Sequence, residues 1–214
     1  MTKAPSFSVF VIGIFALIVG CNRSTDPQAE MTDPEIAKLN EDIRTTPNDA
    51  ELYWRRADAW FARDRFDLAF RDYDEAIRLD PTNSRYFDAR GFAYHMHNRQ
   101  EEKALSDYGE AIRLDPGNHH AINNRAYLLA TTLDDIIRNG VKALADATKA
   151  CEMTKWRNPG YLDTLAVAHA EVGDFEQAIK WETKALEDPA FEKEWGQNAR
   201  KQLRLFRQGK PYRE

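Results

Sequence analysis

The chain has 214 residues, of which 43% are hydrophobic, and this is enough to bury a core in one domain or in an array of small units. Its 35 acidic and 30 basic residues give a net charge of −5, with a pI of about 5.6. This balance argues against a nucleic-acid partner, because proteins that bind nucleic acids normally carry a basic stripe.

The first twenty residues differ in composition from the rest of the chain. Lys3 is followed by the apolar run Phe7–Val19, and a polar stretch follows from Asn22. A membrane-spanning helix needs about 20 apolar residues, so this run is better suited to the hydrophobic region of a signal peptide. We therefore expect residues 1–20 to be a signal peptide.

The apolar run closes with Ile18-Val19-Gly20-Cys21, which resembles the lipobox of bacterial lipoproteins. The resemblance implies cleavage before Cys21 and acylation of its thiol, and acyl chains would hold the protein on a membrane surface. Asn22 after the cysteine implies sorting to the outer membrane, on its periplasmic face. The alternative is an ordinary signal peptide or anchor that happens to contain Cys21. Residues 21–32 are polar and are predicted to be the lipidated cysteine with a flexible tether.

A repeated segment dominates the middle of the chain. The sequence "YDEAIRLDPTN" at Tyr73–Asn83 returns as "YGEAIRLDPGN" at Tyr108–Asn118. Proline cannot continue a helix, so Pro81 and Pro116 are predicted to end helices. Three asparagines spaced 35 residues apart are predicted to begin the next helices: Asn48, Asn83 and Asn118.

Small and aromatic residues recur at helical spacing on both sides of these boundaries. The first unit has Tyr53, Ala57 and Trp60 in one helix and Ala69, Tyr73 and Ala76 in the next, and the second unit has Phe87, Gly91, Tyr94, Ala104, Tyr108 and Ala111. This pattern resembles the tetratricopeptide repeat (TPR), and the resemblance implies an all-α fold, a right-handed solenoid of helical hairpins.

The later units depart from the pattern. Ala143, Ala147 and Ala150 come five residues late, after the segment 131–140, and Glu182 stands where an aromatic residue is expected. We expect a solenoid over residues 33–208, with repeats at 50–83, 84–118, 119–157 and 158–190 and a tail at 209–214. Because a solenoid must cover its apolar ends, capping helices are predicted at 33–45 and 190–208.

Charged residues also recur from unit to unit. Arginine occupies one equivalent position in three first helices and aspartate another in three second helices, whereas the fourth unit has Leu165 and Trp181 at these positions. A joint change from charged to apolar suggests contact across the hairpin, and the guanidinium fork matches a carboxylate. The predicted pairs are Arg56–Asp72, Arg90–Asp107 and Arg125–Asp146. The alternative is that all six are solvated surface charges.

The resemblance further implies a concave groove, lined by the first helices, that binds a peptide or protein segment. Aromatic and charged side chains on such a wall are typical of binding hot spots, although some of the aromatics could simply pack between units. The groove residues carried over from the repeat are Trp54, Asp58, Phe61, Arg85, Asp88, Phe92, His95, His120, Asn123, Tyr127, Asp163 and Val167. The clamp with which some TPR domains grip a terminal carboxylate is not matched, since its positions hold Asp58 and Ala89.

Catalytic or metal chemistry has little support in the sequence. His95 and His120 could lie near Asp88 as a minimal metal site, but no paired-cysteine or HExxH spacing accompanies them. No phosphate-binding loop or nucleophile motif is present, and Cys151 is predicted to be a buried structural thiol. We therefore expect no enzyme activity and no cofactor.

Together these features predict a noncatalytic interaction scaffold or adaptor of the bacterial cell envelope. Its partner would be a protein or peptide of unknown identity bound in the groove, with the membrane reached through the lipid anchor. The alternative is a structural spacer or a pilotin-type assembly lipoprotein without a groove ligand.

Overall fold

The computed structural model describes residues 33–97 and 100–214, and within these ranges it contains ten α-helices and no β-strand. The expected signal peptide, Cys21 and the tether lie outside the described residues. Among the helices described, none is both long and apolar enough to cross a membrane.

Four helical hairpins follow one another along the chain. They are α3 (Ala50–Phe61) with α4 (Phe66–Leu79), α5 (Ser84–Met96) with α6 (Glu101–Leu114), α7 (His119–Thr131) with α8 (Gly140–Met153), and α9 (Pro159–Glu171) with α10 (Phe175–Ala185). A single helix flanks them at each end, α2 (Pro34–Thr45) and α11 (Pro189–Phe206).

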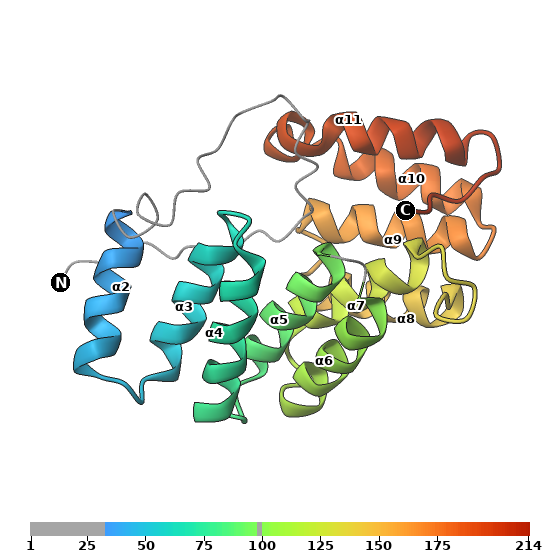
Figure 1. Cartoon of the computed structure of the whole chain (residues 1–214). Helices are drawn as coiled ribbons and strands as arrows, with labels where there is room; N and C mark the ends of the chain where they lie inside the picture. The colour runs from blue at the N-terminus through green and yellow to red at the C-terminus, as the bar shows by residue number, and fades with distance from the viewer. Residues whose placement is uncertain (1–32, 98–99) are drawn as a thin grey trace.

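The hairpins stack side by side into a curved array (Figure 1). Successive first helices contact one another, α3 with α5, α5 with α7, and α7 with α9. Figure 1 shows α11 lying alongside α10 and α9 at the end opposite α2, and the C-terminal segment turning back from the end of α11. The chain is therefore an all-α solenoid of hairpins with a helix over each end.

Asparagine and aspartate side chains begin most of the helices. Asn83 accepts a hydrogen bond from the backbone N–H of Arg85 at 3.2 Å, and Asn118 accepts one from Ala121 at 3.0 Å. Such caps contribute about 1 kcal/mol each. The predictions that Asn83 and Asn118 begin helices are confirmed. The preceding helices end at Leu79 and Leu114, ahead of Pro81 and Pro116, as the sequence predicts.

The prediction that Asn48 begins a helix is wrong. Asp49 is the cap of α3, and its side chain accepts from the backbone N–H of Glu51 at 3.0 Å. The reason is register: Ala50 is the first residue of α3 as Ser84 is of α5, so these helices start 34 residues apart rather than 35.

Small residues allow the two helices of each hairpin to approach closely. Ala57 and Ala69 are completely buried in the first unit, and Tyr73 beside them is 2% exposed. In the second unit a Cβ atom on Gly91 would lie 3.1 Å from both Asp107 and Tyr108, so glycine permits the closest approach there. The three late alanines of the third unit are also fully buried, so its longer loop leaves the hairpin packing unchanged.

The three Arg–Asp pairs predicted across the hairpins are confirmed. Each guanidinium donates two hydrogen bonds to its carboxylate, at 2.7 and 2.8 Å for Arg56–Asp72, 2.8 and 2.8 Å for Arg90–Asp107, and 2.8 and 3.0 Å for Arg125–Asp146. All three aspartates are buried. In the fourth unit Leu165 is buried instead, and the ring of Trp181 stacks on Trp156 with the centroids 5.0 Å apart.

Candidate functional site

The inner side of the array holds a pocket of roughly 130 Å³ where α5, α7, α9 and α11 converge. The three first helices provide one wall and α11 provides the facing wall. The lining side chains are Phe92, His95 and Met96 from α5, Asn123, Asn124 and Tyr127 from α7, Asp163 and Thr164 from α9, Phe191, Trp195 and Asn198 from α11, and Glu214 from the C-terminal segment. Gly160 of α9 completes the lining.

Five of the predicted groove residues meet in this pocket: Phe92, His95, Asn123, Tyr127 and Asp163. The repeat explains why, because Asn123 and Asp163 hold the same position in successive first helices, and Phe92 and Tyr127 share another. Each of these positions points to the inner side of its helix. The sequence therefore predicts the wall formed by the first helices.

Asn123 has an unsatisfied polar atom at this pocket. Its side chain is only 5% exposed, yet its Oδ1 finds no hydrogen-bond donor among the described residues. A buried carbonyl without a donor costs about 1 to 3 kcal/mol. A ligand that donates a hydrogen bond to this oxygen would recover that energy.

The C-terminal segment closes one side of the pocket. The backbone N–H of Glu214 donates to the carbonyl of Thr131 at 2.8 Å, and its carboxylate accepts from the hydroxyls of Tyr127 at 2.9 Å and Tyr212 at 2.5 Å. Tyr212 is 3% exposed, and Arg213 binds Glu171 at 3.0 Å. The segment predicted simply as a tail thus packs against α7 and α9.

A buried polar cluster lies behind the pocket, where Asp163 of α9 is hydrogen-bonded to Glu182 of α10. With its amide nitrogen turned toward the acids, Gln202 of α11 donates to Asp163 at 2.9 Å and to Glu182 at 3.1 Å. Its oxygen then accepts from Asn198 at 3.1 Å.

The acids of this cluster share a proton because both are buried. Burial raises the pKa of Asp163, and the hydrogen bond from Glu182 acts against this increase. Burial and the charge of Asp163 raise the pKa of Glu182 well above its usual value. Glu182 therefore holds a proton with which it can donate to Asp163, so the departure from the repeat at this position builds a polar connection between α9 and α10.

Two more carboxyl groups lie along the inner wall. Asp58 accepts a hydrogen bond from the Tyr73 hydroxyl at 2.6 Å, and Asp88 accepts one from the Asn124 amide at 3.1 Å. Burial raises the pKa of Asp58 to about 6 and that of Asp88 to about 7, and the hydrogen bond to each acid partly offsets this effect. The wall is thus lined with hydrogen-bond acceptors.

The remaining aromatic groove residues lie toward α3. Trp54 packs near Tyr86 at 6.2 Å between centroids, and the guanidinium of Arg85 lies 5.0 Å from its ring centre. Arg85 is also paired with Glu51 at 2.8 Å. Phe61 contacts Phe92 with the ring centroids 5.8 Å apart. These contacts link the first two units, so these aromatics contribute to packing as well as to the wall.

The proposed metal site is not supported, and one groove residue was placed wrongly. Nδ1 of His120 lies 2.9 Å from the Tyr161 hydroxyl, whereas the ring of His95 faces Tyr127 with the centroids 6.2 Å apart. Over residues 33–97 and 100–214, no group of three or more His, Cys, Asp or Glu residues could hold a metal ion. Val167 is completely buried, so it does not line the inner wall.

The repeat pattern does not predict the wall that α11 forms. Phe191 and Trp195 belong to the predicted capping helix at 190–208, and they line the pocket. Asn198 and Gln202, one turn apart on the same side of α11, are the signal that this side meets polar groups.

Comparison with known proteins supports the fold. Residues 50–83 match the family model of the tetratricopeptide repeat. No curated protein matches the sequence significantly. Several solved structures are similar to this one, at 17 to 18% sequence identity.

Among these structures, TTC0263, a thermophilic TPR protein of Thermus thermophilus, has a TM-score of 0.63 over 78% of this chain and 87% of its own. MamA has a TM-score of 0.58 over 71% of this chain and 85% of its own. The Cut9–Hcn1 hetero-tetramer of the APC/C has a TM-score of 0.61 over 74% of this chain and 30% of the matched chain. The first hairpin is therefore a TPR repeat, and the whole array has the all-α TPR solenoid fold, which is typical of protein–protein interaction scaffolds.

Proposed function

We propose that this TPR array is a noncatalytic scaffold that binds a segment of a partner protein along its inner wall, centred on the pocket between α5, α7, α9 and α11. The observation that carries the proposal is the unsatisfied Oδ1 of Asn123 in a pocket walled by aromatic side chains. Trp and Tyr side chains in a concave site are the residue types that dominate binding energies at protein interfaces.

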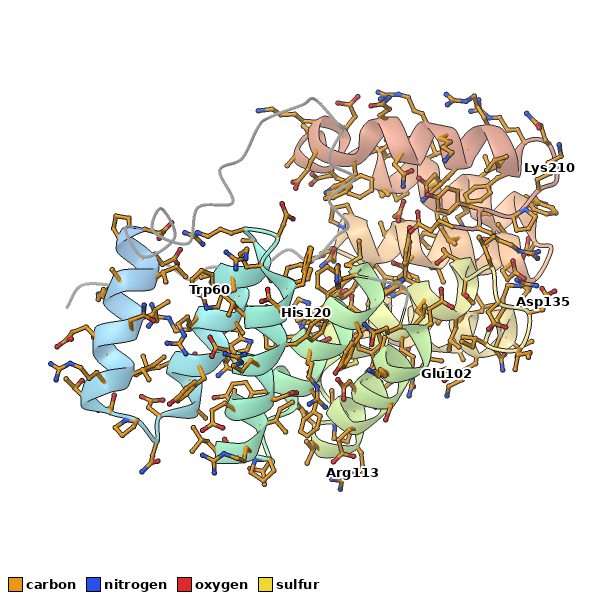
Figure 2. All side chains as sticks on the ribbon, viewed as in Figure 1. Trp60, Glu102, Arg113, His120, Asp135 and Lys210 are labelled. Carbon is orange, nitrogen blue, oxygen red and sulfur yellow. The ribbon has the colours of Figure 1, made fainter. Side chains whose placement is uncertain are left out.

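A photocrosslinking experiment tests the inner wall directly. Met96 lines the pocket and is 38% exposed, so a photoreactive amino acid placed there would lie beside a bound segment. Arg113 is a matched control, because it is an exposed residue on the second helix α6 and lies at the lower edge of the array in Figure 2, away from α11. We expect crosslinked partner protein from position 96 and much less from position 113.

Loss of capture gives a second measurement. Trp195→Ala removes an aromatic wall of the pocket from a partly exposed position on α11, and it should abolish capture at position 96 while the circular-dichroism spectrum stays helical. Equal crosslinking from both positions would instead favour the alternative, a spacer or pilotin-type assembly protein that has no groove ligand. Capture that survives Trp195→Ala would show that the bound segment does not depend on this pocket.

The cellular setting is a separate part of the proposal. The lipobox-like sequence ending in Cys21 supports a lipid anchor in a bacterial envelope, with the array held on the periplasmic face of the outer membrane. Cys21→Ala should move the protein from the membrane fraction to the soluble fraction, and a Cys151→Ala control should not. If Cys21→Ala leaves the protein in the membrane fraction, the anchor is not a lipid on this cysteine.

A further inference from the structure

We infer that the pocket between α5, α7, α9 and α11 receives the guanidinium group of an arginine side chain of the partner. The inference rests on the proposed scaffold function and specifies the chemistry of its central contact. It follows from the acceptors, the aromatic walls and the charge of the pocket.

The acceptors come from three different elements. Asn123 of α7 presents its unsatisfied Oδ1, Asp163 of α9 presents a buried carboxyl group, and Glu214 of the C-terminal segment presents a carboxylate. An arginine carries five N–H donors in a planar fork, so it can satisfy the Asn123 oxygen and at the same time donate to a carboxyl oxygen that has a lone pair left beside its present donor. A partner carboxylate, by contrast, would add a further acceptor to a site already rich in them.

The walls of the pocket favour a planar cation. Tyr127 and Trp195 lie among the lining side chains, and an arginine over an aromatic face gains a cation–π attraction. Arg85 already lies 5.0 Å from the ring centre of Trp54 in this array, which shows the same contact within the protein. The pocket volume of roughly 130 Å³ is several times that required by one water molecule.

The charge of the residues around the pocket also favours a cationic side chain. None of the described lining residues is lysine or arginine, and His95 is the one lining side chain that can carry a positive charge. Asp58 and Asp88 extend the line of acids toward α3, so a chain with basic residues would find further acceptors along the wall. The net charge of −5 supports the approach of a basic partner over longer distances.

Small probes test the pocket without knowledge of the partner. The full chain in mild detergent, with labelled Trp and Asn, is titrated with N-acetyl-arginine methylamide and followed by NMR at the Trp195 indole and the Asn123 amide. The matched probes carry norleucine, lysine or glutamate in place of arginine. We expect saturable shifts for arginine with at least tenfold tighter binding than norleucine, weaker binding of lysine, and no binding of glutamate.

Variants of the acids locate the contact. Glu214→Gln and Asp163→Asn keep the shapes of these side chains and should each weaken binding of the arginine probe at least fivefold, with norleucine binding unchanged. Glu214→Gln leaves the buried cluster behind the pocket intact, so it remains informative if Asp163→Asn disturbs the fold. The control is Glu102→Gln, an exposed acid that Figure 2 places on α6. Equal binding of arginine and norleucine, or of all variants, would overturn the inference.

Peptide display on the same protein separates this inference from the scaffold proposal. Selection of pocket-binding peptides without a preferred arginine would overturn the inference and leave the scaffold proposal intact. Binding of the arginine probe together with failure to capture any protein at position 96 would overturn the scaffold proposal and leave the arginine specificity of the pocket intact.

Discussion

Replacing Glu182 with glutamine should stabilise the protein at neutral pH. Glu182 is completely buried and is hydrogen-bonded to Asp163, which is 6% exposed. Burial and the neighbouring carboxylate raise the pKa of Glu182 well above its usual 4.5, so the folded protein keeps a proton that the unfolded chain releases. Glutamine can donate to Asp163 as the protonated acid does, but it requires no proton uptake.

The size of the effect follows from this difference in bound protons. For a carboxyl group whose pKa is raised by folding, stability is full below the unfolded pKa and falls as the pH rises toward the folded pKa. Each pH unit in that window is worth about 1.4 kcal/mol, and pH 7 lies about 2.5 units above 4.5, so the upper bound is about 3.4 kcal/mol. We expect Glu182→Gln to stabilise the protein by up to this amount at pH 7 and by less than about 1 kcal/mol at pH 5.

Urea unfolding at pH 5, 6, 7 and 8, followed by circular dichroism and Trp fluorescence, measures this difference. Glu176→Gln on the same helix is the control, because Glu176 is exposed and its replacement should change stability by less than about 0.5 kcal/mol at every pH. A gain that is constant from pH 5 to pH 8 would refute the shared-proton interpretation, as would a Glu182→Gln protein that is less stable than the wild type at pH 7.

Three other predictions follow from buried contacts. Arg90→Ala should lower the free energy of unfolding by about 3 kcal/mol because it leaves the buried Asp107 carboxylate unpaired, whereas replacing both residues with leucine should change it by only about 1 kcal/mol. Urea unfolding of the single and double variants tests this, and equal losses would contradict it. Tyr212→Ala should cost about 3 kcal/mol and lower the melting temperature, while Arg213→Ala, on an exposed side chain, should have little effect. Burial raises the pKa of the Cys151 thiol to about 12, so a thiol reagent should label it only in denaturant, and rapid labelling of the native protein would show that this burial is incomplete.

The repeat allows the hairpin packing to be predicted in detail. Equivalent positions in the repeat predict the three ion pairs, because the change to Leu165 and Trp181 occurs at both positions together. Helix starts were predictable where an Asx residue precedes the first turn. The prediction for Asn48 is wrong because the spacing of the first helices is not an even 35 residues, and Asp49 is the residue that directly precedes α3.

The pocket could be predicted only in part. Position within the repeat places Phe92 and Tyr127 on the inner wall, since this depends only on the periodicity of each helix. The contributions of Trp195 and Glu214 depend on how far the array curves and where the chain turns after α11, and local pattern determines neither. Glu182 did show in the sequence that the last hairpin differs, but its partners became evident only in three dimensions.

The return of the C-terminal segment changes how the array should respond to force. A solenoid whose units contact only their neighbours unfolds one unit at a time from its ends. Here the hydrogen bond from Tyr127 to Glu214 joins residues 87 positions apart, so α7 to α11 are closed into one block. Among the contacts described, no bond of this span closes α2 to α6. Tension applied from the N-terminal side should therefore unfold α2 to α6 in small steps and then unfold α7 to α11 in one cooperative event.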